Sequence, residues 1–207
     1  MSAGALLKWD LPLLDRVLTR QPVKRAKRSS RLVLISCSAT KRPDGARMPA
    51  IERYDGPLWQ TLRTADPNGT LAQVAFLSAH YGFRSASTPI ADYDARLTRD
   101  LADAMIAGGM TTRWPRPRLA SMPDTVGAHP GVEIAGLYHA AGEPLRDIAL
   151  VGGALYLEVM RAFLVGFREM GCIAADATVT EINGPIGFMR RDLRRWLHSD
   201  PTRPQTR

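Results

Sequence analysis

The sequence predicts an α/β domain with a mainly parallel central sheet flanked by helices. Short apolar runs typical of buried strands occupy residues 31–38, 71–79 and 148–151, and small polar residues or glycines follow each run. Helical patterns separate these runs, and strands that alternate with helices are typical of a parallel sheet. The chain has 207 residues, 45% of them hydrophobic, which fits a single globular domain with a sizeable core.

The first half of the chain predicts two strands and two helices around a basic arm. Residues 5–19 carry apolar side chains at helical spacing and predict a short N-terminal helix, and residues 20–30 form the arm. In residues 31–38 the run Leu-Val-Leu-Ile has no polar interruption, so we expect this strand to be covered on both faces. Residues 50–65 predict a helix, and residues 71–79 predict the second buried strand.

The second half predicts further alternation after a long irregular stretch. Residues 95–108 predict a helix that ends at two glycines. Residues 110–147 are rich in proline and glycine and predict loops, with one strand at 132–137. The alternation continues in the order strand 148–151, helix 154–170, strand 177–182 and helix 187–197. The predicted divisions are an N-terminal helix and basic arm at 1–30, an α/β domain at 31–198 and a basic, proline-rich tail at 199–207.

The charge balance indicates a polyanion as the partner, with nucleic acid as the first candidate. Lys and Arg number 28 against 20 Asp and Glu, which gives a formal net charge of +8. No apolar run approaches the roughly 20 residues that span a bilayer, and the N-terminus lacks the order of a secretory signal. We therefore expect a cytoplasmic protein that does not contact a membrane.

The cysteine and histidine content argues against a metal site. Cys37 and Cys172 are the only cysteines, and the four histidines are scattered. Because no C-x-x-C pair or cluster with metal-ligand spacing occurs, we expect no metal and no cofactor. Two free thiols are the usual state of such a pair in a cytosolic chain.

The positive charge is concentrated in three clusters. They comprise Arg20, Lys24, Arg25, Lys27, Arg28 and Arg31 in the arm, Arg113, Arg116 and Arg118 between tryptophan and prolines, and Arg190, Arg191, Arg194 and Arg195 near the C-terminus. One such cluster is typical of a solvated face, whereas three in a small domain favour contact with phosphates. The predicted phosphate contacts are Lys24, Arg25, Lys27, Arg28, Arg84, Arg116, Arg190, Arg191 and Arg194.

Polar or glycine-rich turns follow three of the predicted strands. Ser36, Cys37 and Ser38 end the first strand, residues 78–82 end the second, and a Gly-Gly pair at 152–153 ends the third. Ligands of open α/β sheets bind outside the carboxyl ends of the strands. We therefore expect these three turns to face a common crevice.

The first of these turns suits an anion. Residues 36–41 combine backbone N–H groups, hydroxyls and the ammonium group of Lys41, although the P-loop pattern is missing. An ordinary polar junction between strand and loop is the alternative. Cys37 is interpreted as a small buried hydrophobe in preference to a nucleophile.

The second turn and the segment after it contain the largest number of reactive side chains within a short stretch. His80 and Tyr81 lie close in sequence to Asp92, Tyr93 and Asp94. A tyrosine here can stack on a base. The two aspartates, two residues apart in an extended segment, would point the same way, and one would hold a raised pKa suited to activating water or stabilising a cation. The alternative is that they are loop residues, with Asp94 capping the next helix.

A third candidate is the glycine-rich turn at 181–187, which leads into the arginine-bearing helix. A helix N-terminus of this kind can receive a phosphate. An ordinary turn before a solvated basic helix is the alternative.

The motifs, taken in order, resemble the YaaA-like superfamily. They are S-C-S-x-x-K at 36–41, Tyr54 with G-P-L at 56–58, L-S-A-x-Y-G at 77–82, P-I-x-x-Y-D at 89–94, V-G-G-x-x-Y at 151–156 and G-P-I-G-x-x-x-R-x-L-R-x-W-L at 184–197. The first motif is also similar to P-C-S-x-x-K in the catalytic domain of archaeosine synthase, with Ser36 in place of the proline. Residues 1–30 and 110–130 lie outside the likeness.

The resemblance implies DNA or modified nucleobases as the working context. The residues on its motifs that we expect to bind the substrate base are Ser36, Cys37, Ser38, Lys41, Tyr54, Ser78, Tyr81, Gly82, Tyr93, Gly153 and Tyr156. The expected partner is duplex DNA with modified bases, and by analogy with the family the protein would serve in defence against phage.

These observations lead to the hypothesis of a DNA glycosylase that acts on a modified base. The base would be flipped into the crevice, Asp94 or Asp92 would stabilise the oxocarbenium-like transition state, and His80 would assist the leaving base. Two alternatives stay open: a non-catalytic DNA-binding stress protein, and a nucleobase- or tRNA-modifying transferase with Lys41 and Cys37 at its centre. A metal-dependent nuclease is disfavoured by the absence of a metal-ligand pattern.

Overall fold

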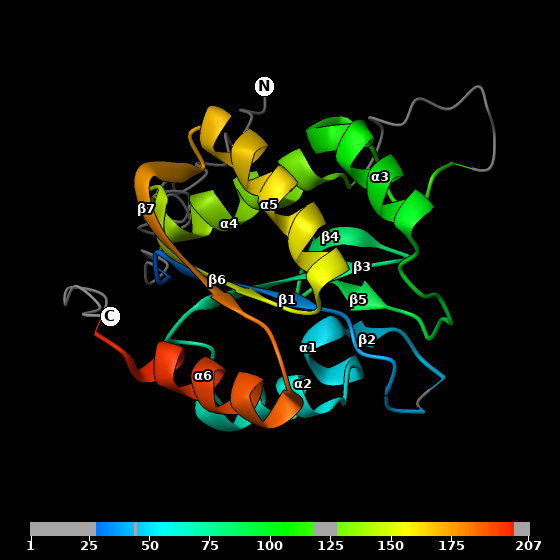
Figure 1. Cartoon of the computed structure of the whole chain (residues 1–207), viewed down its shortest axis with the longest axis horizontal. Helices are drawn as coiled ribbons and strands as arrows, with labels where there is room; N and C mark the ends of the chain where they lie inside the picture. The colour runs from blue at the N-terminus through cyan, green and yellow to red at the C-terminus, as the bar shows by residue number, and fades with distance from the viewer. Residues whose placement is uncertain (1–27, 44, 118–127, 201–207) are drawn as a thin grey trace, which may run out of the picture.

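The computed structural model describes residues 28–43, 45–117 and 128–200, and its centre is a five-stranded sheet in the order β4-β3-β1-β6-β7 (Figure 1). The parallel strands are β1 (Arg31–Ser36), β3 (Gln73–Ser78), β6 (Leu145–Val151) and β7 (Ile173–Ile182), and β4 (Gly82–Ser85) runs antiparallel to β3. The predicted fold class is therefore confirmed. The helix predicted at 5–19, most of the arm and most of the tail lie outside the described residues.

β1 is the central strand, and this position explains its sequence. It pairs with β3 on one side, where Val33 faces Val74, and with β6 on the other, where Val33 faces Ala149. All side chains of its apolar run are fully buried. A strand covered on both faces needs apolar residues at every position, because neither alternate set of side chains reaches water.

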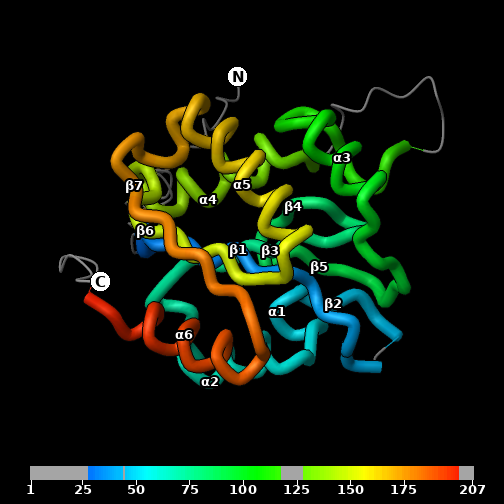
Figure 2. The backbone as a smooth tube through the Cα atoms, viewed as in Figure 1, coloured from blue at the N-terminus to red at the C-terminus, as the bar shows by residue number. Residues whose placement is uncertain are grey.

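Helices cover both faces of the sheet (Figure 1). In that view α3 (Arg99–Gly108), α4 (Pro130–Ala141) and α5 (Ala154–Glu169) lie above it, and α1 (Ala50–Arg53), α2 (Pro57–Ala65) and α6 (Ile186–His198) lie below it. Leu32 and Leu34 pack into the upper core, whereas Val33 and Ile35 pack into the lower one. Figure 2 shows the turn after β7 carrying the chain across to α6, which packs beside α2.

Two predicted helices have other bounds in the structure, and three short strands were not predicted. The single helix predicted at 50–65 is divided into α1 and α2, because Pro57 opens α2 and the residue before a proline disfavours helical dihedrals. The helix predicted from residue 95 begins at Arg99, where the Thr98 side chain accepts the N–H of Leu101. Strand β4 and the small pair β2 (Met48–Pro49) with β5 (Pro89–Ile90) were not predicted.

The predicted strand at 132–137 is wrong, because these residues lie within α4. Pro130 opens the helix and Gly142 closes it in a left-handed conformation. Ile134, Leu137 and Ala141 follow the helical spacing and are buried on one face. Pro130 and Gly142 therefore mark the two ends of a helix, although a stretch rich in proline and glycine suggests a loop.

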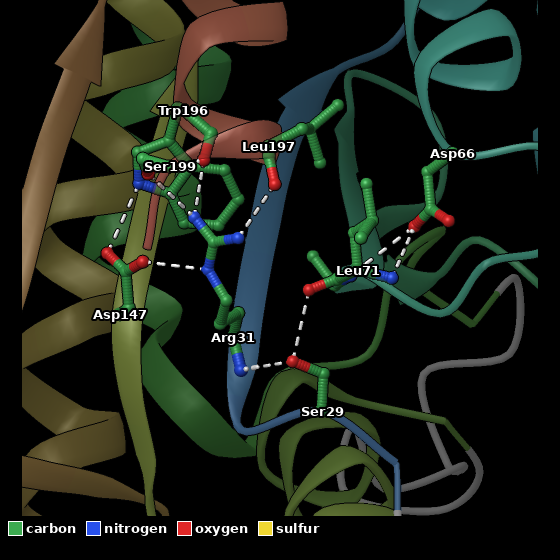
Figure 3. A network of polar contacts seen from close by, with 9 residues as sticks. Ser29, Arg31, Asp66, Leu71, Asp147, Trp196, Leu197 and Ser199 are labelled. Carbon is green, nitrogen blue, oxygen red and sulfur yellow. Dashed lines mark hydrogen bonds and ion pairs between the residues drawn. The ribbon is translucent and has the colours of Figure 1, made fainter. Parts of the chain in front are cut away.

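Arg31 is part of the core, although the sequence groups it with the basic cluster at 20–31 (Figure 3). It is 7% exposed, its Nε donates to Asp147 at 2.8 Å, and its guanidinium lies 4.1 Å from the centre of the Trp196 ring. The guanidinium also donates to the backbone carbonyl groups of Trp196 and Leu197 at the end of α6. Arg31 thus holds α6 against the sheet and presents no charge to a partner.

Candidate functional site

The order of the strands places a switch point between β1 and β6. From β1 the chain moves to β3 on one side, and it later returns to β6 on the other side. Adjacent connections that leave in opposite directions open a crevice at the carboxyl ends of the two strands. A Cβ atom at Gly152 would lie 3.1 Å from the Cβ of Ser36 and 3.3 Å from that of Tyr156. The glycine therefore lets the turns after β1 and β6 approach closely.

Cys37 and Tyr156 meet at this switch point. The Sγ of Cys37 lies 3.1 Å from the Oη of Tyr156, which stands in the first turn of α5 after Gly153. Burial raises the pKa of Tyr156, and the neighbouring sulfur adds to the rise. The ends of β1 and β6 therefore bring Cys37 and Tyr156 into contact, with Ser36 and Gly153 close to them in the chain.

Tyr93 is the centre of a second group, at the carboxyl end of β3. Its Oη lies 2.8 Å from the Oγ of Ser78 and 2.6 Å from the Oη of Tyr54. Ser78 and Tyr54 are fully buried. They were predicted to bind the base, but they lie beneath Tyr93 and support it, because no part of either side chain reaches solvent.

The rings of His80 and Tyr81 and the ammonium group of Lys41 gather around Tyr93. The ring of His80 stacks on that of Tyr93 with the centroids 5.0 Å apart, and Tyr81 meets both rings edge-on. The Nζ of Lys41 lies 4.3 Å from the centre of the Tyr93 ring and donates to its backbone carbonyl at 2.7 Å. Burial lowers the pKa of His80, so its imidazole is neutral at pH 7.

The two aspartates lie on the outer side of this group. Asp92 and Asp94 are exposed, whereas Tyr93 between them is half-buried and packs inward. The side chains of Asp92 and Asp94 therefore point to the same side, as expected for residues two apart in an extended segment. That side is opposite to the one on which the Tyr93 ring packs. The Oδ1 of Asp92 accepts the N–H of Tyr93. Asp94 does not cap α3, since Thr98 has that role.

Gly82 has a conformational role in the turn between β3 and β4. Its φ of 64° lies in the left-handed region, which favours glycine, and a Cβ there would come within 2.9 Å of Trp114. The residue therefore allows the turn from β3 into β4.

A small hollow of about 70 Å³ adjoins the Cys37 turn. It is lined by Ser36, Cys37, Ser38, Gly56, Pro57, Leu58, Trp59 and Ile186. The turn after β1 therefore lies beside the first residues of both α2 and α6. This arrangement places Ser38 at the edge of the hollow.

A larger cavity, of about 400 Å³, lies at the other end of β3, and the sequence did not suggest it. Gln73 and Val74 line it with Leu62, Ala72 and Ala86. Its walls are mostly apolar, and its charged groups are engaged or lie at its rim: Asp66 accepts three backbone N–H groups and Arg63 pairs with Asp55. We favour the strand-end site, because the phenols, thiol, imidazole and ammonium group lie there.

The predicted phosphate contacts fall into three sets. Arg28, Arg116, Arg191 and Arg194 are exposed, and Arg190 is half-buried, with its Nε donating to Thr61. Lys24, Arg25 and Lys27 lie outside the described residues. The prediction for Arg84 is wrong: it is 6% exposed and donates to the carbonyl of Trp114 at 2.6 Å, and burial lowers its pKa.

The sequence analysis did not identify two exposed apolar side chains at the start of α6. Ile186 and Phe188 are 48% and 54% exposed, and the guanidinium of Arg191 lies 4.9 Å from the centre of the Phe188 ring. Ile186 also lines the hollow beside Cys37. The motif at 184–197 contains both residues, but the pattern does not reveal their exposure.

Within residues 28–43, 45–117 and 128–200, no group of three or more His, Cys, Asp or Glu side chains is placed to hold a metal ion. No helix in the same residues is long and apolar enough to cross a membrane.

Comparisons with protein-family models, with curated proteins and with solved structures found no match to this chain.

Proposed function

We propose that the protein acts on a nucleobase in DNA and hydrolyses the N-glycosidic bond of a modified base. One observation carries the proposal: half-exposed aromatic rings, a thiol and an ammonium group gather at the carboxyl ends of β1, β3 and β6. Flat heteroaromatic ligands are held by ring contacts together with a few polar groups at fixed positions. A nucleobase has both features.

The surface beside this site suits a nucleic acid. α6 carries Arg190, Arg191, Arg194 and Arg195 with one acid, Asp192, which pairs with Arg191 and Arg195. Phe188 and Ile186 stand exposed in its first turn. Cations bind phosphates, and apolar side chains can enter the space between base steps when a nucleotide leaves the stack. This combination supports DNA as the polymer.

The exposed aspartates suit the sugar of a flipped nucleotide. A base placed against the aromatic rings would leave its deoxyribose at the rim, on the side of the adjoining residues Asp92 and Asp94. Cleavage of the bond between C1′ and nitrogen develops positive charge on the sugar, which a carboxylate stabilises. Water adds to C1′, the electron pair of the broken bond stays with the base nitrogen, and a proton returns to the base.

Formation of an abasic site tests the proposal. The substrates are duplexes that carry glucosylated hydroxymethylcytosine or a substituted deazaguanine, with the unmodified duplex as the reference. We expect alkali-labile sites on a modified duplex only, and loss of turnover with retained binding in Asp94→Asn or Asp92→Asn. If no duplex gains abasic sites, the glycosylase proposal is wrong.

The contact between Cys37 and Tyr156 favours a second candidate, a base-modifying transferase. A thiol beside a phenol, with Lys41 near, offers a nucleophile and proton carriers in one place. This candidate predicts that Cys37→Ser abolishes activity while Asp94→Asn does not. It also predicts that tRNA displaces DNA in a competition gel.

A further inference from the structure

The contacts of the Ser78 hydroxyl group indicate where its proton goes. Its Oγ accepts the backbone N–H of His80 at 3.0 Å and that of Tyr81 at 3.1 Å. Both of these contacts use the oxygen as an acceptor. The third contact of Oγ is the Oη of Tyr93 at 2.8 Å. Since a hydroxyl carries one proton, Ser78 donates that proton to Tyr93.

Tyr54 is constrained in the same way. Its side chain is fully buried, and its Oη lies 2.6 Å from the Oη of Tyr93. Burial is the largest cause of the raised pKa of Tyr54, and the hydrogen bond with Tyr93 adds to it, as expected for the group that donates. A buried hydroxyl whose proton has no acceptor costs free energy. Tyr54 therefore also donates to Tyr93.

Tyr93 thus accepts two hydrogen bonds, and its own proton is left for a further acceptor. Tyr93 interacts with Cys37: burial is the largest cause of the raised pKa of Tyr93, and the charge of Cys37 and a hydrogen bond between the two side chains add to it. Tyr156 also lies against this sulfur. Two phenol groups therefore face one thiol, and sulfur is a weak acceptor.

We infer that Tyr93 and Tyr156 recognise a carbonyl oxygen of the bound base, which replaces the sulfur of Cys37 as the acceptor of their protons. The site then selects oxo-bearing bases over bases that present an amino group at the same place. The inference rests on the proposed function, because it names the class of base that this site takes. Tyr54 and Ser78 are positioning residues, since they act only by fixing the direction of the Tyr93 proton.

Hypoxanthine and adenine test this inference without any cleavage. They share the purine frame, but hypoxanthine carries a carbonyl oxygen where adenine carries an amino group. We expect the full chain to bind hypoxanthine at least about fivefold more tightly than adenine in calorimetric titrations. Tyr93→Phe should lose most of this preference while its affinity for adenine changes little. Tyr54→Phe should reduce the preference by a smaller factor.

Tyr138→Phe is the matched control, because Tyr138 lies on α4, away from the strand-end site. It removes one phenol hydroxyl outside the cluster and should keep the preference for hypoxanthine. Equal affinity for the two bases in the unchanged protein overturns the inference, as does a preference that survives in Tyr93→Phe or no binding of either base. Adenine binding and the amide spectrum show whether each variant is folded.

The two proposals can fail separately. A hypoxanthine preference that depends on Tyr93, found together with no abasic sites on any duplex, keeps the recognition of oxo-bearing bases and rejects the glycosylase. Abasic sites on a modified duplex, found without a preference for hypoxanthine, keep the glycosylase and reject the recognition of oxo-bearing bases by Tyr93 and Tyr156.

Discussion

The sulfur of Cys37 lies 3.1 Å from the hydroxyl oxygen of Tyr156, so the turn after β1 and the first turn of α5 touch across the switch point of the sheet. This contact distinguishes the two thiols of the chain. Cys37 is half-exposed, whereas Cys172 is 5% exposed and burial raises the pKa of its thiol. The two cysteines should therefore react at different rates.

Iodoacetamide should modify Cys37 well before Cys172 in the folded protein at pH 7. The reactive species is the thiolate, which a buried thiol with a raised pKa forms less readily. Peptide mass spectrometry over time gives the two rates. The protein unfolded in urea is the control, and there both cysteines should react alike. Equal rates in the folded state would contradict the described burial of Cys172.

Arg31→Met should destabilise the fold by about 3–5 kcal/mol, because it leaves the largely buried carboxylate of Asp147, 13% exposed, without its cation. Urea unfolding measures the change. Arg161→Ala is the control, since Arg161 forms its ion pair with Glu181 at the surface and such a pair contributes about 0.2–1 kcal/mol. Similar losses in the two variants would show that Arg31 does not hold α6 as described.

Arg194→Ala should weaken DNA binding and reduce its salt dependence. Each phosphate contact contributes roughly 0.9 to the slope of log K against log salt, so one lost contact should lower the slope by about that amount. Fluorescence anisotropy at several salt concentrations gives the slope. Arg146→Ala is the control, because Arg146 is exposed near the start of β6, away from the strand ends. An unchanged slope in Arg194→Ala would show that Arg194 on α6 does not contact DNA phosphates as proposed.

Phe188→Ala should affect binding in a different way. The ring is exposed and carries no charge, so its loss should lower the affinity for DNA without changing the salt slope. An apolar wedge fills the space left by a flipped base, and 2-aminopurine fluorescence in the duplex reports that flipping. We expect weaker fluorescence enhancement in Phe188→Ala. The same enhancement in both proteins would contradict a role as a wedge.

His80 should make the protein less stable as the pH falls. Burial lowers its pKa in the folded state from the ordinary value of 6.5. Between that value and the lower folded pKa, the unfolded chain binds the proton first, so protonation favours unfolding. The stabilisation by neutral His80 is complete above pH 6.5 and is lost toward the folded pKa. The effect should be small because the ring is half-exposed.

An NMR titration of the His80 ring should give a pKa below 6.5, and His80→Gln should lose less stability than the unchanged protein between pH 7 and about pH 5. His139→Gln is the control variant for stability, because His139 lies on α4, away from the site. A pKa for His80 at or above 6.5 would mean that the imidazole is not desolvated against Tyr93.

The fold was predictable where burial leaves a direct mark on the sequence. The run at 32–35 is apolar at every position because β1 is covered on both faces. α4 was not predictable in the same way, because its terminal Pro130 and Gly142 have the composition of a loop. The partners of Arg31 and Arg84 lie far away in sequence, so only the fold shows that these arginines are buried.

The sequence indicates which residues of the candidate site are neighbours. It does not indicate which of them are buried and which lie at the surface. Parallel strands bring their carboxyl ends together, which places Cys37 and Tyr156 in contact. The motifs name Tyr54 and Tyr93 alike, but only the packing shows that Tyr54 lies beneath Tyr93. The alternation around Tyr93 places Asp92 and Asp94 together, and the direction of the pair depends on which side of the segment packs inward.

Two locations compete for a bound base: the strand-end cluster and the larger cavity around Gln73 at the other end of β3. NMR titration of the labelled protein with hypoxanthine separates them most directly. We expect the largest amide shifts at Cys37, His80 and Tyr93, with little change at Ala72 and Gln73. Shifts confined to Ala72 and Gln73 would contradict a nucleobase site at the carboxyl ends of the strands.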